Sequence, residues 1–251
     1  MPNDRQMERI NHLVSVLDRS FDTDNVLGYH GTSIEVLQYL IEHGRFAGMT
    51  ARTDTYYKKG DLYFYPRLQA LPKKFQKLYE RKRHSDDDRI QGAMVYAKML
   101  AADHAFAAQV GWPMGDDRFS LICLSSWVTS LFKLSRVRQK RNWTRAEQHE
   151  YQELMEFRRT CRLDKAAFLS AALTAVKRKG VILALDKKIL RHHSIHPGDD
   201  FKPPFIMHSE PGDLFIRGGK GLDYKFICGI KLLGSEEESF MAHLKLVSAL
   251  S

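Results

Sequence analysis

The chain lacks any long apolar segment. No uninterrupted apolar run among its 251 residues approaches the roughly 20 residues that a helix needs to cross a bilayer. The residues that follow Met1 lead into no signal-type hydrophobic region. We therefore expect a globular protein that acts in the cytoplasm, made there or delivered there.

Cysteine is scarce and metal motifs are missing. Three widely spaced cysteines, an odd number, argue against a disulfide framework and against zinc, so Cys123, Cys161 and Cys228 are expected to be small buried apolar residues. His192, His193 and His196 lie close in sequence, but no cysteine accompanies them to complete a zinc set. We expect a solvent-facing loop there and no metal. The G-x-S-x-G turn of serine hydrolases is also missing.

Acidic residues are outnumbered, 30 against 39 Lys and Arg, which leaves a net charge of +9. Such a balance favours a polyanionic partner, nucleic acid first. One basic block, within residues 67–89, is expected to be a mobile loop or a solvated helix face inserted into the domain. A second block, about 133–160, combines phosphate-attracting and base-stacking side chains, although a solubilising helix surface would look similar. Its candidates for nucleic-acid contact are Arg136, Arg138, Lys140, Arg141 and Trp143.

Hydrophobic periodicity predicts helices and strands that do not alternate in a βαβ rhythm. We expect α+β architecture, with a mostly antiparallel sheet and helices packed around it. The expected helices are 7–17, 34–44, 90–110, 145–157, 164–179 and 240–247, and the expected strands are 26–30, 61–65, 119–124, 181–185, 214–216 and 224–230.

The most informative stretch is Val26–Ser33, where an apolar run ends in Tyr-His-Gly-Thr-Ser and a helix follows at once. The segment from Thr32 to Glu35 fits a capping box. A glycine lets a flat ligand approach the backbone, and a histidine can hydrogen-bond a sugar hydroxyl. Ordinary turn chemistry is the alternative interpretation of this stretch.

Four segments in order complete a pattern. After Tyr29-His30-Gly31-Thr32 come G-D-L-Y-F (60–64) and A-M-V-Y-A (93–97), then the strand 181–185, and then E-P-G-D-L-F-I (210–216) ahead of Y-K-F-I-C-G-I (224–230). This order resembles the ADP-ribosyltransferase superfamily, in the diphtheria-toxin-like and poly(ADP-ribose)-polymerase-like branch with a His-Tyr-Glu triad. The resemblance implies a split antiparallel sheet core with surrounding helices, in a single domain 1–251 that carries the two basic blocks as insertions.

The resemblance also implies NAD⁺ as substrate, with no metal. His30 would bind a ribose hydroxyl and the Gly31 backbone would pair with the carboxamide, with Thr32 beside them. Tyr63 would stack on the nicotinamide, with Tyr65 as its substitute. Cleavage of the nicotinamide–ribose bond passes through an oxocarbenium-like sugar, so the site must position the dinucleotide and stabilise positive charge.

The acidic member of the triad has two candidates. A carboxylate must accept a hydrogen bond from the ribose 2′-hydroxyl and lie close to the forming cation. Glu210 has the reach and the usual residue type and is preferred. Asp213 stands directly before the strand, where the family usually has its glutamate, but is one methylene shorter. Both could instead be turn residues around Pro211 and Gly212.

The sequence therefore predicts an ADP-ribosyltransferase, a toxin or defence-type effector that modifies RNA or DNA. A protein acceptor is the second interpretation, and a neutralising antitoxin is an expected partner for such an effector. An RNA 2′-phosphotransferase is disfavoured because no arginine precedes His30 in residues 25–29. A non-catalytic nucleic-acid-binding module remains the alternative from another class.

Overall fold

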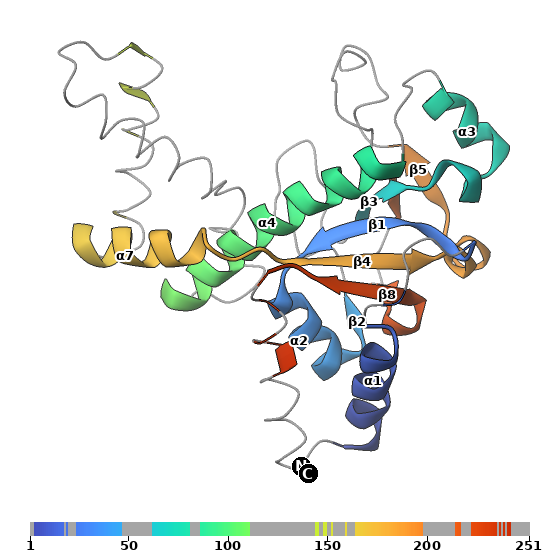
Figure 1. Cartoon of the computed structure of the whole chain (residues 1–251), viewed down its shortest axis with the longest axis horizontal. Coiled ribbons are helices and arrows are strands. Elements are labelled where there is room, and N and C mark those ends of the chain that lie inside the picture. The colour runs from blue at the N-terminus through green and yellow to red at the C-terminus, as the bar shows by residue number, and fades with distance from the viewer. Residues whose placement is uncertain are drawn as a thin grey trace.

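An antiparallel sheet of six strands, ordered β5-β6-β3-β1-β4-β8, forms the centre of this computed structural model (Figure 1). Each neighbouring pair is antiparallel, which confirms the expected α+β class. In chain order the six strands are β1 (Val26–Thr32), β3 (Leu62–Pro66), β4 (Val181–Asp186), β5 (Ile195–Pro197), β6 (Leu214–Ile216) and β8 (Ile227–Leu232). Two short strands, β2 (Arg45–Phe46) and β7 (Leu222–Asp223), pair separately.

The helices are α1 (Asp4–Ser15), α2 (Ile34–His43), α3 (Lys73–Glu80), α4 (Asp86–Val110) and α7 (Lys165–Ala175), with 3-10 turns η1 (Leu68–Ala70), η3 (Lys187–Arg191) and η6 (Tyr224–Phe226). The structure describes residues 3–17, 19, 24–46, 62–80, 86–110, 144–145, 148–149, 152, 159, 164–197, 214–216, 222–234, 236, 238 and 240–241. The expected strand 119–124 and most of the expected helices 145–157 and 240–247 lie outside these residues. No described helix is both long and apolar enough to cross a membrane.

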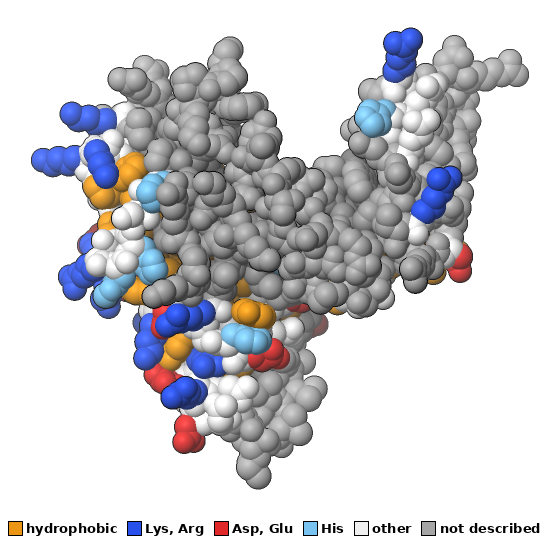
Figure 2. Space-filling view, turned by 180° about the vertical axis from the view of Figure 1, so that it is seen from behind, with side chains coloured by type: hydrophobic (Ala, Val, Ile, Leu, Met, Phe, Trp, Pro, Cys, Tyr) orange, Lys and Arg blue, Asp and Glu red, His pale blue; other side chains and the backbone are white. Residues whose placement is uncertain are grey.

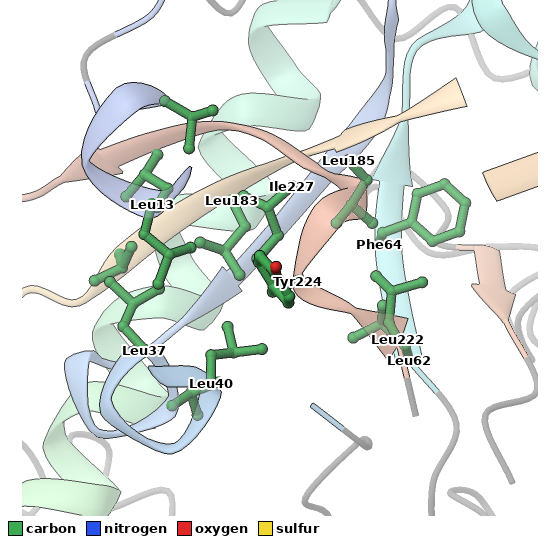
Figure 3. Close-up of a cluster of buried hydrophobic side chains, with 14 of the residues drawn as sticks. Leu13, Leu37, Leu40, Leu62, Phe64, Leu183, Leu185, Leu222, Tyr224 and Ile227 are labelled. Carbon is green, nitrogen blue, oxygen red and sulfur yellow. The ribbon is translucent and has the colours of Figure 1, made fainter. Parts of the chain in front are cut away.

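The strand β4, which lies between β1 and β8, is buried along its whole length, because helices cover both faces of the sheet. Its residues alternate between two clusters: Leu183 and Leu185 join the side chains of α1 and α2, whereas Ile182 and Ala184 join those of α4. This alternation is the two-residue period of a strand, and the continuous apolar run of β4 serves both faces. Figure 3 shows the α1–α2 side, with Leu13, Leu37 and Leu40 turned toward β4.

The helix α4 lies unusually close to the sheet because small residues meet at the contact. A Cβ added to Gly31 would overlap the carbonyl oxygen of Ala93, and one added to Gly180 would overlap that of Ala97. Both alanines are fully buried. The two alanines of the A-x-x-Y-A segment thus have a packing role, since larger side chains would hold the helix away from β1 and β4.

The described part of the first basic block is mostly helical. After β3, η1 and α3 form a helix pair in which Leu71 and Phe75 are buried in the main core, while Lys73, Lys74 and Lys77 are exposed. Of the two expectations for this block, the solvated helix face is the one observed within residues 67–77. The long helix α4 begins at Asp86, earlier than the periodicity suggested, so that three aspartates form its first turn, where negative charge is favourable.

Gly180 provides a test of the close approach of α4. Its φ of +80° is strained for any residue with a side chain, and an added methyl would meet α4. We expect Gly180→Ala to lower the free energy of unfolding by about 2 kcal/mol or more, measured by denaturant titration. Gly229→Ala is the control, because its Cβ would lie 3.2 Å from the nearest atom; equal losses in both variants would contradict the proposed contact.

Candidate functional site

His30 is the one residue of β1 that keeps some solvent exposure, since the other six are buried. Tyr29 packs in the α4 cluster and Gly31 abuts α4. Because successive residues of a strand point to opposite faces, His30 lies on the face of α1 and α2. It is therefore the residue of the His-Gly-Thr segment that solvent reaches.

The ladder between β1 and β3 ends just before His30. These strands pair only at Gly28 with Pro66 and at Tyr29 with Tyr65. Beyond that point β1 continues beside β4 as far as Thr32, while residues 62–64 of β3 pair with β6. The sheet thus divides at His30, and within the described residues the next part of β1 has no ladder partner on its β3 side.

Three of the segments singled out in the sequence lie on adjacent strands, in the order β6-β3-β1. Leu214, the residue after Asp213, pairs with Phe64, and the next residue of β3, Tyr65, pairs with Tyr29. The candidate acids Glu210 and Asp213 themselves lie outside the described residues. The strand that follows them in sequence is β6, and one strand, β3, separates it from the β1 segment that carries His30.

The two candidate stacking tyrosines differ in what the structure describes of them. The backbone of Tyr63 pairs with Phe215, but its side chain is outside the description. Tyr65 is only 6% exposed; its ring lies against Gly92 and 5.8 Å from the ring of Tyr96. Tyr65 therefore faces α4, on the sheet face opposite to His30. In this position it offers no open ring face to a nicotinamide, which corrects its expected role as a substitute for Tyr63.

The predicted capping box at the start of α2 is wrong. The N-cap residue is Ser33, and its side chain makes no capping hydrogen bond. Its hydroxyl instead shares a hydrogen bond of 2.6 Å with Nδ1 of His104 on α4. Thr32, expected beside NAD⁺, is 1% exposed. Ser33 therefore joins α2 to α4, and both polar residues after Gly31 are buried.

Burial governs the titration of His104. Desolvation lowers the pKa of this imidazole from 6.5 to about 4, because charge is costly away from water. The ring is neutral at physiological pH and serves as a hydrogen-bond partner for Ser33. Nothing in the sequence around His104 distinguished it from the apolar residues of its helix.

A partly buried ion network joins Glu35 to the start of β4. Arg178 donates to both carboxylate oxygens of Glu236, at 2.6 and 2.7 Å, and lies 3.3 Å from Glu35. Glu236 is fully buried and also accepts from the backbone of Lys179 at 3.1 Å. Burial alone would raise the pKa of Glu236, but its bonds to Arg178 and to backbone amides outweigh this and lower it. The network is structural, and its partners are too far apart in sequence to have been anticipated.

The other expected sites are described only in part. The nucleic-acid candidates Arg136, Arg138, Lys140, Arg141 and Trp143 lie outside the described residues. Among the residues that are described, no three His, Cys, Asp or Glu side chains are grouped to hold a metal ion. His192 and His193 flank the ring of Phe226, with centroid distances of 5.5 and 5.9 Å. Cys228 is half-buried, and desolvation raises the pKa of its thiol to about 11, so it is unreactive.

Comparison with known proteins gives no match to a family model, a curated protein or a solved structure.

The Ser33–His104 contact predicts a pH dependence of stability. The folded pKa of about 4 lies below the unfolded value of 6.5. The neutral ring therefore contributes stability that is complete above about pH 6.5 and is lost as the pH falls toward 4, at up to about 1.4 kcal/mol per pH unit. We expect His104→Asn to destabilise the protein at pH 7, and expect the gap from wild type to shrink at pH 4.5 in denaturant titrations.

Ser33→Ala is the control for this pH dependence, because it keeps the buried imidazole and should keep the wild-type slope. A gap between wild type and His104→Asn that is the same at pH 7 and pH 4.5 would contradict the assignment.

Proposed function

We propose that this protein is an NAD⁺-dependent ADP-ribosyltransferase of the His-Tyr-Glu branch, which cleaves the nicotinamide–ribose bond and transfers ADP-ribose to a macromolecule, preferably nucleic acid. We propose that it acts as a toxin or defence-type effector. The split antiparallel sheet of that superfamily is part of the proposal.

One observation carries the proposal: β1 and β3 part at His30, while β6, β3 and β1 remain neighbours. A strand edge outside a ladder presents backbone N–H and C=O groups. A carboxamide carries the complementary donor and acceptor, so this edge suits the nicotinamide amide. The half-exposed His30 is placed beside it to hold a ribose hydroxyl.

The reaction requires the protein to position NAD⁺ and to stabilise the positive charge that develops on the ribose. The bond between ribose C1′ and the nicotinamide nitrogen breaks, and its electron pair leaves with nicotinamide. A nucleophilic atom of the acceptor then bonds to C1′ and loses a proton. In this scheme His30 orients the ribose, and a carboxylate from Glu210 or Asp213 stabilises the cationic sugar.

Nicotinamide release from labelled NAD⁺ tests the role of His30. We expect His30→Ala to lower the rate by about 100-fold, because a misplaced ribose loses the gain from positioning. His43→Ala, at an exposed histidine of α2, should leave the rate unchanged. A wild-type protein that releases no nicotinamide with any acceptor, or a His30→Ala protein with full activity, would overturn the proposal.

The same assay identifies the acid. We expect Glu210→Gln to be nearly inactive and Asp213→Asn to retain most activity, since the glutamate has the longer reach. The reverse result would assign the role to Asp213. If both variants were fully active, no carboxylate of this segment would stabilise the sugar cation.

Acceptor choice is read from label transfer in parallel incubations with RNA, single-stranded DNA and lysate protein. Label on nucleic acid supports the preferred version, and label on protein alone supports a protein-modifying enzyme. Binding of nucleic acid without any nicotinamide release would instead identify a non-catalytic binding module.

A further inference from the structure

Two basic segments that lie more than 100 residues apart in the sequence reach the same end of the sheet, beside the first residues of β1. The strands β3 and β4 flank β1 and run antiparallel to it, so both end beside its first residues. The chain after β3 is held there by a hydrogen bond from the Arg67 amide to the Leu27 carbonyl, 2.8 Å. The chain after β4 is held by one from the Lys187 amide to the Asn25 carbonyl, also 2.8 Å.

Both segments are poor in acidic residues. Residues 67–80 contain one, Glu80 at the end of α3, and residues 187–197 contain none. Six of their seven Lys and Arg side chains are exposed and one is half-buried; the seven are Arg67, Lys73, Lys74, Lys77, Lys187, Lys188 and Arg191. We name this surface the basic edge. Figure 2 shows Lys and Arg side chains gathered along the left of the molecule, where α3 and η3 lie when Figure 1 is seen from behind.

Neighbouring acids cancel little of this charge. Asp186 is 8% exposed and pairs with Lys188 at 3.5 Å, so one lysine is matched. Asp24 is exposed near the start of β1, and its backbone carbonyl accepts from Nζ of Lys187 at 2.8 Å. The lysines of α3 and Arg191 form no ion pair with another side chain that the structure describes, and they lie on both sides of the start of β1.

We propose that the basic edge binds the phosphate backbone of a nucleic acid. Phosphate contact needs clustered cations and little else. An anionic membrane is the other polyanion to consider, but membrane association also uses exposed apolar anchors. The exposed large apolar side chains of the described residues are Val14, Val95, Leu173 and Met241, and none lies in either segment. Charge without apolar anchors favours nucleic acid.

This inference deepens the proposed function and rests on it, because it proposes where the nucleic-acid acceptor binds. The residues it uses are not those of the second basic block, 133–160. Binding is measured without NAD⁺. Loss of binding in a variant that still releases nicotinamide, and loss of nicotinamide release in a protein that still binds, are therefore distinguishable results.

The test is fluorescence anisotropy with labelled 30-nucleotide single-stranded RNA, single-stranded DNA and duplex DNA across a salt series. We expect Lys73→Glu/Lys77→Glu/Arg191→Glu in the full chain to weaken binding at least tenfold. The slope of log affinity against log salt should fall in magnitude by roughly 2 to 3, because about three phosphate contacts are removed. The neutral version, with Gln at the same positions, should give an intermediate loss.

The matched control is Lys98→Glu/Lys177→Glu/Lys231→Glu. These three side chains are exposed and lie near the other end of β4, since Lys231 pairs with Ile182 and Lys177 precedes that strand. The control changes the net charge equally, so a loss caused by net charge alone would appear in both triple variants. We expect it to bind within about threefold of wild type.

Three outcomes would overturn the inference. The two triple variants could lose affinity equally, the basic-edge variant could bind like wild type, or the wild-type protein could bind no nucleic acid. In the last case, sedimentation with phosphatidylserine vesicles that depends on the basic edge would identify a lipid surface instead. Melting curves of all variants confirm that they are folded.

Discussion

The close contact of α4 with β1 and β4 is the constraint on which the remainder of the structure depends. Gly31 and Gly180 leave no room for a side chain, and Ala93 and Ala97 fill the space between. Because helix and sheet meet at backbone distance, only small residues fit at this contact. The same strand β1 leaves its ladder with β3 after Tyr29, and this is the feature that the proposed activity uses.

Buried polar groups secure the same end of the sheet. Ser33 and His104 connect α2 to α4, and Arg178 connects Glu35 to Glu236 at the entry to β4. Breaking a buried ion pair commonly costs more than its formation contributes, because a charge is left unpaired. Loss of either partner in these contacts is therefore expected to destabilise the end of the sheet that carries His30.

Part of the chain's positive charge lies in two segments that the fold brings together. One basic segment follows β3 and the other follows β4, and the antiparallel order around β1 brings both to one edge. The candidate site at His30 lies on the central strand of that arrangement, further along the same strand. A polyanionic acceptor held at the basic edge would thus be held by the two strands that flank the His30 strand.

Local patterns in the sequence determined the elements: the continuous apolar run of β4, the periodicity of α2 with Gly44 in its left-handed C-terminal position, and the Asp164 cap of α7. These depend on neighbours a few residues away, so they can be derived from sequence. Only the tertiary structure decided that Ser33 would bond to His104, that Tyr65 would be covered by α4, and that Arg67 and Lys187 would share an edge. Those outcomes depend on which distant groups compete for the same side chain or space, and no local pattern records that competition.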